Sequence, residues 1–261
     1  MPAGYAHLDF GNEVIKTLEP QVQDIIKKYI DLYHIGVHGP DILFYHQPLK
    51  SNDVKNLGYQ MHKEMAYDFF IRSKKIVKES NNQEASLAYI LGFITHFTLD
   101  SECHGYVGEV ERTKHLTHSE IESEFDRELL IRNGLNPLTT SLTSHVHPSD
   151  MIDNVIAPFF NLQPINIKKS LKGMLTYLGF LLAPGKLKRN FVLGAMKIAG
   201  IYEGYKGLMI NYEKNPICED DVLELISKKD NAVVVAKTLI EDYLNQLDSE
   251  ELTERFRKNY E

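Results

Sequence analysis

Residues 87–100, Leu-Ala-Tyr-Ile-Leu-Gly-Phe-Ile-Thr-His-Phe-Thr-Leu-Asp, are the stretch of this chain that decides the fold. A helix over these residues is apolar on nearly every side, which is typical of a helix at the centre of a globular protein. Its polar end contains an imidazole and a carboxylate, at His96 and Asp100, and a buried charge without a partner is strongly unfavourable. The stretch therefore predicts a buried central helix whose His96 and Asp100 are paired with other groups or bind a metal ion.

Potential metal ligands continue beyond this helix at a regular spacing. His96, Asp100 and His104 are each four residues apart, and His118 and Glu122 are again four apart. Four residues make about one helical turn, so each group is expected on one face of a helix. The spacing favours metal binding over structural hydrogen bonding for His96 and Asp100. Metal binding is also favoured for His118 and Glu122 when His104 is considered together with them.

Three further residues are ambiguous when each is taken alone. Asp41 follows Gly39-Pro40 in an expected loop, where an N-cap aspartate is the ordinary interpretation. His62 lies on an expected long helix, where a surface histidine is more common than a metal ligand. His7 lies in a small-residue segment before the first expected helix and gives no signal by itself.

The composition is that of a soluble globular protein. The 261 residues are 43% hydrophobic and 25% charged, and 29 basic against 36 acidic residues give a net charge of −7. This balance, without a long basic run, argues against a dedicated nucleic-acid-binding protein. Cys103 and Cys218 do not resemble a disulfide framework. Because the sequence shows no leader-like segment and no apolar run of about 18 residues, it predicts a cytoplasmic protein that does not span a membrane.

The first half of the chain predicts several further helices. Two apolar-periodic segments between residues 14 and 33 are separated at Glu19-Pro20, and residues 36–48 are expected to form a loop. One long helix is expected after Ser51-Asn52, with a single apolar stripe at Leu57, Met61, Met65 and Phe69. Capping boxes are expected before the next two helices, at the pairs Ser80/Gln83 and Thr117/Glu120.

The second half also predicts helices, so the expected fold is all-α. One helix should begin at Pro148-Ser149 and run toward Phe160, and a long apolar one should run from Pro164 to Ala183. Two or three more are expected between residues 187 and 260, with the β-like run 232–236 interpreted as buried helix. We expect a single helical domain, residues 1–261, with a metal-site half at 1–135 and a helical extension at 148–261.

As an ordered set, these residues resemble the zinc-dependent phospholipase C family, whose multi-helical fold is shared with single-strand-specific zinc nucleases. The matching positions lie in the first half of the chain and are His7 in Ala-Gly-Tyr-Ala-His, Asp41 in Gly-Pro-Asp, His62, His96, Asp100, His104, His118 and Glu122. The resemblance implies three zinc ions. Asp100 would bridge two of them.

The resemblance also implies how the remaining ligands are shared. His96, Asp41 and His62 would complete the first ion of the bridged pair, and His7 would hold the second together with the N-terminal amine. The third ion would lie between the side chains of His104, His118 and Glu122. Asp41 and Asp100 would be the catalytic carboxylates.

The sequence departs from the family at two points. It contains no tryptophan, whereas secreted members expose a tryptophan N-terminus, so the terminal amine would come from Met1 or from Pro2 after removal of the methionine. The interval from Asp100 to His104 is short, which would move His104 off the helix.

Imidazoles with carboxylates suit zinc, and close zinc ions lower the pKa of a bridging water. We therefore expect a phospholipase C-like phosphoester hydrolase that cleaves a phosphodiester with a metal-bridging hydroxide. The alternatives are a single-strand-specific zinc nuclease or phosphomonoesterase, and a non-catalytic helical protein that zinc stabilises. A ferritin-like bundle would need Glu-x-x-His pairs, and the sequence contains no His-Asp dipeptide of the corresponding phosphohydrolases.

The expected partner is a phospholipid or another phosphoester, with nucleic acid less favoured. Phe44, Tyr45 and Tyr59 are candidate pocket walls, although aromatic residues near a loop are more often core. The basic and apolar stretch 186–197 is a candidate for peripheral membrane contact, with a solvated helix face as the ordinary interpretation. The oligomeric state is open at this point.

Overall fold

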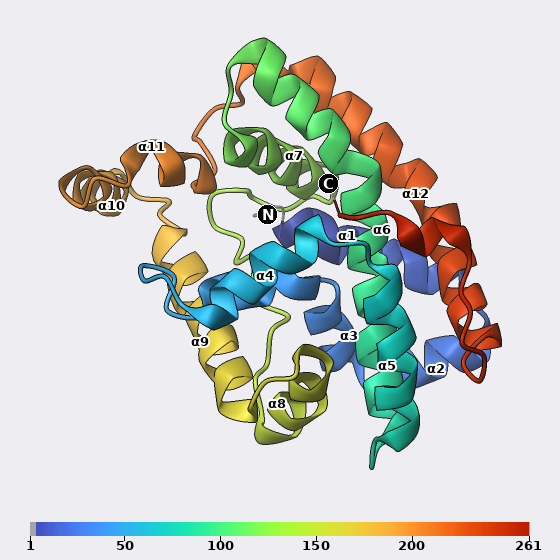
Figure 1. Cartoon of the computed structure of the whole chain (residues 1–261). Coiled ribbons are helices and arrows are strands. Elements are labelled where there is room, and N and C mark those ends of the chain that lie inside the picture. The colour runs from blue at the N-terminus through green and yellow to red at the C-terminus, as the bar shows by residue number, and fades with distance from the viewer. Residues whose placement is uncertain (1–3, 261) are drawn as a thin grey trace.

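A computed structural model of the chain describes residues 4–260. Within this range the protein contains twelve α-helices and five short 3₁₀ helices, and no strand. The all-α prediction is confirmed. The centre is α6 (Gln83–Lys114), whose residues 88–100 are all buried. Figure 1 shows the other helices arranged around α6.

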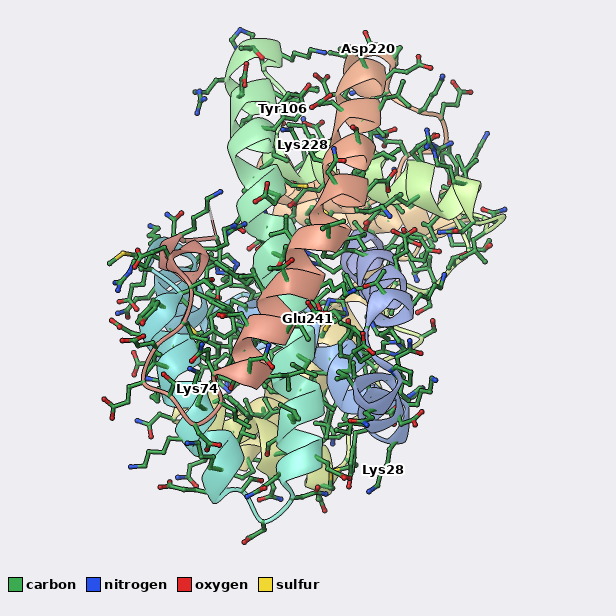
Figure 2. The ribbon with its side chains drawn as sticks, turned by 90° about the vertical axis from the view of Figure 1, so that its right-hand side faces the viewer. Lys28, Lys74, Tyr106, Asp220, Lys228 and Glu241 are labelled. Carbon is green, nitrogen blue, oxygen red and sulfur yellow. The ribbon has the colours of Figure 1, made fainter. Side chains whose placement is uncertain are left out.

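Five helices make the most extensive contacts with α6: α1 (Gly4–Thr17), α3 (Ile30–Gly36), α5 (Tyr67–Glu79), α7 (His118–Arg132) and α12 (Glu219–Asn245). The crossing of α3 over α6 is close because both helices have a glycine there. A Cβ on Gly36 would come within 2.3 Å of the backbone oxygen of Tyr89, and one on Gly92 within 2.3 Å of that of Tyr33. Figure 2 shows α12 running along α6, with Lys228 of α12 beside Tyr106 of α6.

The remaining helices lie on different sides of this central group (Figure 1). They are α2 (Pro20–Lys28), α4 (Asp53–Lys63), α8 (Asp150–Ile156), α9 (Pro164–Leu181), α10 (Lys186–Ile198) and α11 (Tyr202–Tyr205), with the 3₁₀ segments η1 (Gly39–Tyr45), η2 (Ala157–Phe160), η3 (Lys206–Leu208), η4 (Pro216–Cys218) and η5 (Glu254–Arg257). Buried apolar side chains from Tyr5 to Tyr260 form one contiguous core. A small separate cluster lies beneath α10.

Several expected boundaries are confirmed. The first helix ends before Glu19-Pro20, Thr117 and Glu120 form the capping box of α7, and Ser149 caps α8. Residues 232–236 are helical as predicted and lie inside α12, but only Ala232 and Ala236 are buried, and Val234 is exposed. The first segment is longer than expected, since α1 begins at Gly4 and so includes His7.

Other expected boundaries are wrong. The loop at 36–48 contains η1, which begins at the positive φ of Gly39 and has Pro40 in its first turn. The single helix after Asn52 is two helices, because the backbone of Ala66 is hydrogen-bonded to the carbonyl of Lys258 from the end of the chain. Asn82, not Ser80, caps α6.

Candidate metal centre

Helix α6 carries three of the candidate ligands on one face. His96, Asp100 and His104 follow each other at one-turn intervals, and α6 continues unbroken to Lys114. The prediction that His104 leaves the helix is therefore wrong. The last turns stay helical because Val107 and Val110 are buried against neighbouring helices.

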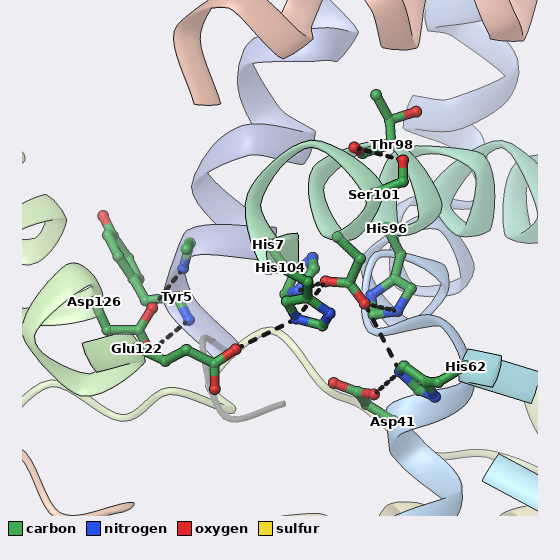
Figure 3. Close-up of polar contacts among 12 residues, drawn as sticks. Tyr5, His7, Asp41, His62, His96, Thr98, Ser101, His104, Glu122 and Asp126 are labelled. Atoms are coloured by element: carbon green, nitrogen blue, oxygen red, sulfur yellow. Dashed lines mark hydrogen bonds and ion pairs between the residues drawn. The ribbon is translucent and has the colours of Figure 1, made fainter. Parts of the chain in front are cut away.

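Asp100 lies at the centre of four imidazoles. They belong to His7, His62, His96 and His104, which Figure 3 shows gathered in one place. Its Oδ1 is 3.2 Å from Nε2 of His7 and 3.4 Å from Nε2 of His104. Its Oδ2 is 3.0 Å from Nε2 of His96 and 3.7 Å from Nε2 of His62. The two oxygens of one buried carboxylate thus face two different pairs of histidines.

Asp41 and His62 come from η1 and α4, which pack side by side. Nε2 of His62 is 3.0 Å from Oδ1 of Asp41, and both side chains are buried. The neighbouring Gly39 has a positive φ, and a Cβ there would lie 2.1 Å from the ring of His96. Glycine is therefore required at this position for two reasons, its backbone conformation and the ring packed against it. Asp41 is not the N-cap that the ordinary interpretation suggested.

His7 is positioned by a buried carboxylate at the start of α1. Asp126 of α7 accepts hydrogen bonds from the backbone N–H groups of Tyr5 and Ala6, at 3.2 and 2.8 Å. Free N–H groups at a helix N-terminus favour a negative partner. Burial nevertheless raises the pKa of Asp126 to about 7. The ring of His7 stacks on that of His96, with 4.5 Å between centroids.

A second, more open group adjoins the first. Oε1 of Glu122 is 3.1 Å from Nε2 of His118 and 3.5 Å from Nε2 of His104. His104 therefore faces both Asp100 and Glu122. The side chain of His118 is 35% exposed, so this end of the cluster reaches the surface.

The carboxylates in this cluster are held in their charged form. Burial would raise the pKa of Asp100, but His104 and His96 hold it well below its usual range. Burial would likewise raise the pKa of Asp41, and His62 lowers it. For His96 itself, burial lowers the pKa. The lowered pKa favours the neutral imidazole, which is the form that binds metals.

The arrangement fits metal ions better than it fits hydrogen bonds. Nε2 of His62 and of His96, with Oδ1 of Asp41 and Oδ2 of Asp100, are buried and have no hydrogen-bond partner among the described residues, although they lie about one hydrogen-bond length apart. Atoms so placed are directed at shared points rather than at one another. Three groups have ligand atoms within 4.8 Å of one another: His7/His96/Asp100, Asp41/His62/His96 and His104/His118/Glu122. The donor set of imidazole and carboxylate suits zinc.

The structure brings all eight candidate side chains into this one cluster. The expected N-terminal amine ligand, from Met1 or Pro2, lies outside the described residues. Sequence reasoning missed Tyr260, whose ring lies 5.3 Å from that of His62 and 5.8 Å from that of His96. No local pattern near the end of the chain could have placed it there.

Sequence reasoning also missed a second group of histidines behind the cluster. His38 and His145 are buried, and their Nε2 atoms lie 2.7 Å apart. Burial, with the nearby His34 and His147, lowers the pKa of His145 to about 3. These two rings form a neutral pair, and His38 directly precedes η1. Their separation of more than 100 residues left no spacing signal.

The comparisons with known proteins agree with this geometry. The profile of the family described as zinc-dependent phospholipase C matches residues 6–169, which is more than half of the chain and includes all eight candidate ligands. The chain belongs to the zinc-dependent phospholipase C family. No curated protein and no solved structure matches it significantly. Membership of this zinc-dependent phospholipase C family confirms the resemblance, and the site's histidines and carboxylates could bind the family's metal.

Proposed function

We propose that this protein is a zinc-dependent phosphoester hydrolase of the phospholipase C type, which cleaves a phosphodiester with water as the nucleophile. The observation that carries the proposal is the position of Asp100. Its ion-pair partners among the described residues are four imidazoles, on both of its oxygens. A structural carboxylate needs one such partner, whereas a carboxylate shared by two metal positions needs several.

The protein's residues would hold up to three zinc ions in the three groups described above. Zinc, when bound, stabilises negative charge on phosphoryl oxygens and makes a water molecule acidic enough to attack phosphorus near neutral pH. Asp100 would hold two ions at a fixed separation. Asp41, beside His62, would orient the attacking water and accept its proton. Burial around His96 keeps bulk water out, and the exposed side of His118 gives the substrate access.

Neighbouring aromatic residues support a phospholipid-like substrate. The ring of Phe44 lies 5.3 Å from that of His62 and 4.5 Å from that of Tyr59. The phenol of Tyr45 is within electrostatic reach of Asp41, since burial and this carboxylate raise its pKa. These three residues also line an apolar groove, and Phe44 touches both the groove and His62. A substrate with a phosphoryl group and a hydrocarbon part suits this layout.

The experiment is metal analysis followed by turnover measurements. Purified protein should contain zinc and hydrolyse a chromogenic phosphodiester and phosphatidylcholine, and a zinc chelator should remove both the metal and the activity. Full activity after chelation would contradict the proposal. Faster cleavage of a single-stranded oligonucleotide would favour the nuclease alternative, and zinc without turnover of any substrate would favour a zinc-stabilised binding protein.

A further inference from the structure

Among the helices within residues 4–260, α10 carries the two most exposed large apolar side chains. Leu187 is 89% exposed, Phe191 69% and Ile198 92%. At about 100° per residue these three positions lie within about 40° of one another around the helix. They form one apolar stripe, while Val192 and Met196 on the opposite face pack against the body of the protein. Figure 1 shows α10 at the outer edge of the molecule.

The charge around this stripe is opposite to that of the whole chain. None of the 36 acidic residues lies between Asp153 and Glu203. Seven of the 29 basic residues do. Lys186, Lys188, Arg189 and Lys197 lie on α10 itself, while Lys168, Lys169 and Lys172 lie on α9, where Lys168 is paired with Asp150. Lys188 and Arg189 donate hydrogen bonds to backbone carbonyls, which fixes their positions without neutralising their charge. The segment is therefore a basic region on an acidic protein.

An apolar groove lies directly behind the stripe. Its volume is about 260 Å³, and α9, α10, α11, η1 and α4 line it. Ala195 and Met196 form its outer wall, and Phe44, Tyr45 and Tyr59 form its inner wall. Helix α9 closes against η1 because Gly173 has no side chain: a Cβ there would lie 2.1 Å from the backbone oxygen of Tyr45. The groove thus runs from α10 to the residues beside the metal centre.

We propose that α10 docks this protein on an anionic phospholipid bilayer, with Leu187, Phe191 and Ile198 inserted at the interface and one acyl chain held in the groove. An apolar stripe flanked by lysines is the pattern of a helix that lies in the membrane surface. The helix is about 20 Å long, and none of the helices within residues 4–260 is long and apolar enough to cross a bilayer. The inference rests on the proposed phospholipid substrate for the acyl chain, but docking itself needs no metal.

Vesicle sedimentation tests the docking surface. The purified full-length protein should bind vesicles of phosphatidylcholine with about one third phosphatidylglycerol, and should bind pure phosphatidylcholine vesicles more weakly. The double variant L187S/F191S should lose at least tenfold in binding. A matched variant of exposed apolar residues on α12, L223S/V234S, should bind normally. K186Q/K197Q should reduce the preference for anionic vesicles.

Specific results would overturn docking. They are absence of binding to either vesicle, equal binding by L187S/F191S, or equal loss in the α12 control. Light scattering covers the other occupant, a second copy of the chain. A concentration-dependent dimer that L187S/F191S abolishes would assign the stripe to self-association instead.

The groove has its own variant, Ala195→Phe, which fills it from the outer wall. This variant should lose binding of a fluorescent long-chain fatty acid while keeping vesicle binding, and unchanged probe binding would overturn the acyl-chain part. Vesicle binding by a protein without phosphodiesterase activity would contradict the proposed function and leave docking intact. Turnover of a soluble chromogen without vesicle binding would support the proposed function and contradict docking.

Discussion

Helices α6 and α10 depart from the usual distribution of side chains in opposite ways. Helix α6 buries His96 and Asp100 among apolar residues, whereas α10 exposes Leu187 and Phe191 among basic ones. Buried charge and exposed apolar surface both carry a free-energy cost that folding alone does not require. Each helix therefore carries a feature that packing alone does not explain, and the proposed metal ion would account for the first and the proposed lipid surface for the second.

The largest effect is expected from a change in the buried carboxylate of α6. Asp100→Asn should lower turnover by about 10³-fold or more, because the neutral amide cannot hold two cations together. Zinc content should fall, while helical content by circular dichroism should not, since asparagine keeps the shape of the side chain. Asp150→Asn, at an exposed carboxylate paired with Lys168, is the matched control. Full activity in the Asp100 variant would refute the role of this carboxylate.

Two glycines allow the packing beside α6 to be compared with the packing beside α10. Gly39 and Gly200 both have a positive φ, but a Cβ would strike His96 at Gly39 and would meet nothing within 4 Å at Gly200. Gly39→Ala should cost about 2–5 kcal/mol in unfolding free energy and reduce zinc content. Gly200→Ala should cost about 1 kcal/mol, from its backbone conformation alone. Urea unfolding measures both, and equal losses would show that His96 is not fixed by this contact.

Acid should lower the unfolding free energy, because the buried, neutral His145 becomes protonated more readily in the unfolded chain. His145 has a folded-state pKa of about 3, below its value in the unfolded chain. Its contribution to stability is therefore present above pH 6.5 and is lost as the pH falls toward 3. Zinc-free wild-type protein should lose up to about 1.4 kcal/mol more per pH unit in this window than His145→Asn.

The pH dependence is measured by urea unfolding at several pH values, with chelator present so that metal release does not contribute. The exposed His115 gives the control variant His115→Asn, whose pH dependence should match that of the wild type. Parallel curves for wild type and His145→Asn would show that protonation of His145 is not what acid acts on.

The smallest effect is expected from a change in the exposed apolar stripe of α10. Leu187→Ser should change the unfolding free energy by less than about 0.5 kcal/mol, since an exposed side chain has few contacts to lose. Leu91→Ser, at a fully buried residue of α6, should be strongly destabilising. Thermal unfolding distinguishes them. A large loss at Leu187 would mean that the stripe is covered by part of the folded protein.

Features that depend on local patterns could be predicted from the sequence, whereas features that depend on tertiary contacts could not. The central helix was readable because its apolar run is local, and the ligands of α6 and α7 because each pair lies one turn apart. His104 was misplaced because its helix continues through tertiary packing, which no local pattern shows. Tyr260 and the His38–His145 pair depend on contacts between distant segments. The basic and apolar stretch 186–197 was recognisable in the sequence, but which of its apolar side chains are exposed depends on how the helix packs, and this only the structure shows.

Residues from both ends of the described chain enclose the metal centre, and this affects when the centre can form during protein synthesis. The rings of His7 and Tyr260, from opposite ends of the described chain, both lie against His96, and the backbone N–H of Tyr260 donates to the carbonyl of His62. A growing chain would therefore carry most of its metal ligands long before the wall that encloses them. Zinc that arrived early would meet an open, water-filled set of histidines, so the finished centre forms only after residue 260 has left the ribosome and folded back.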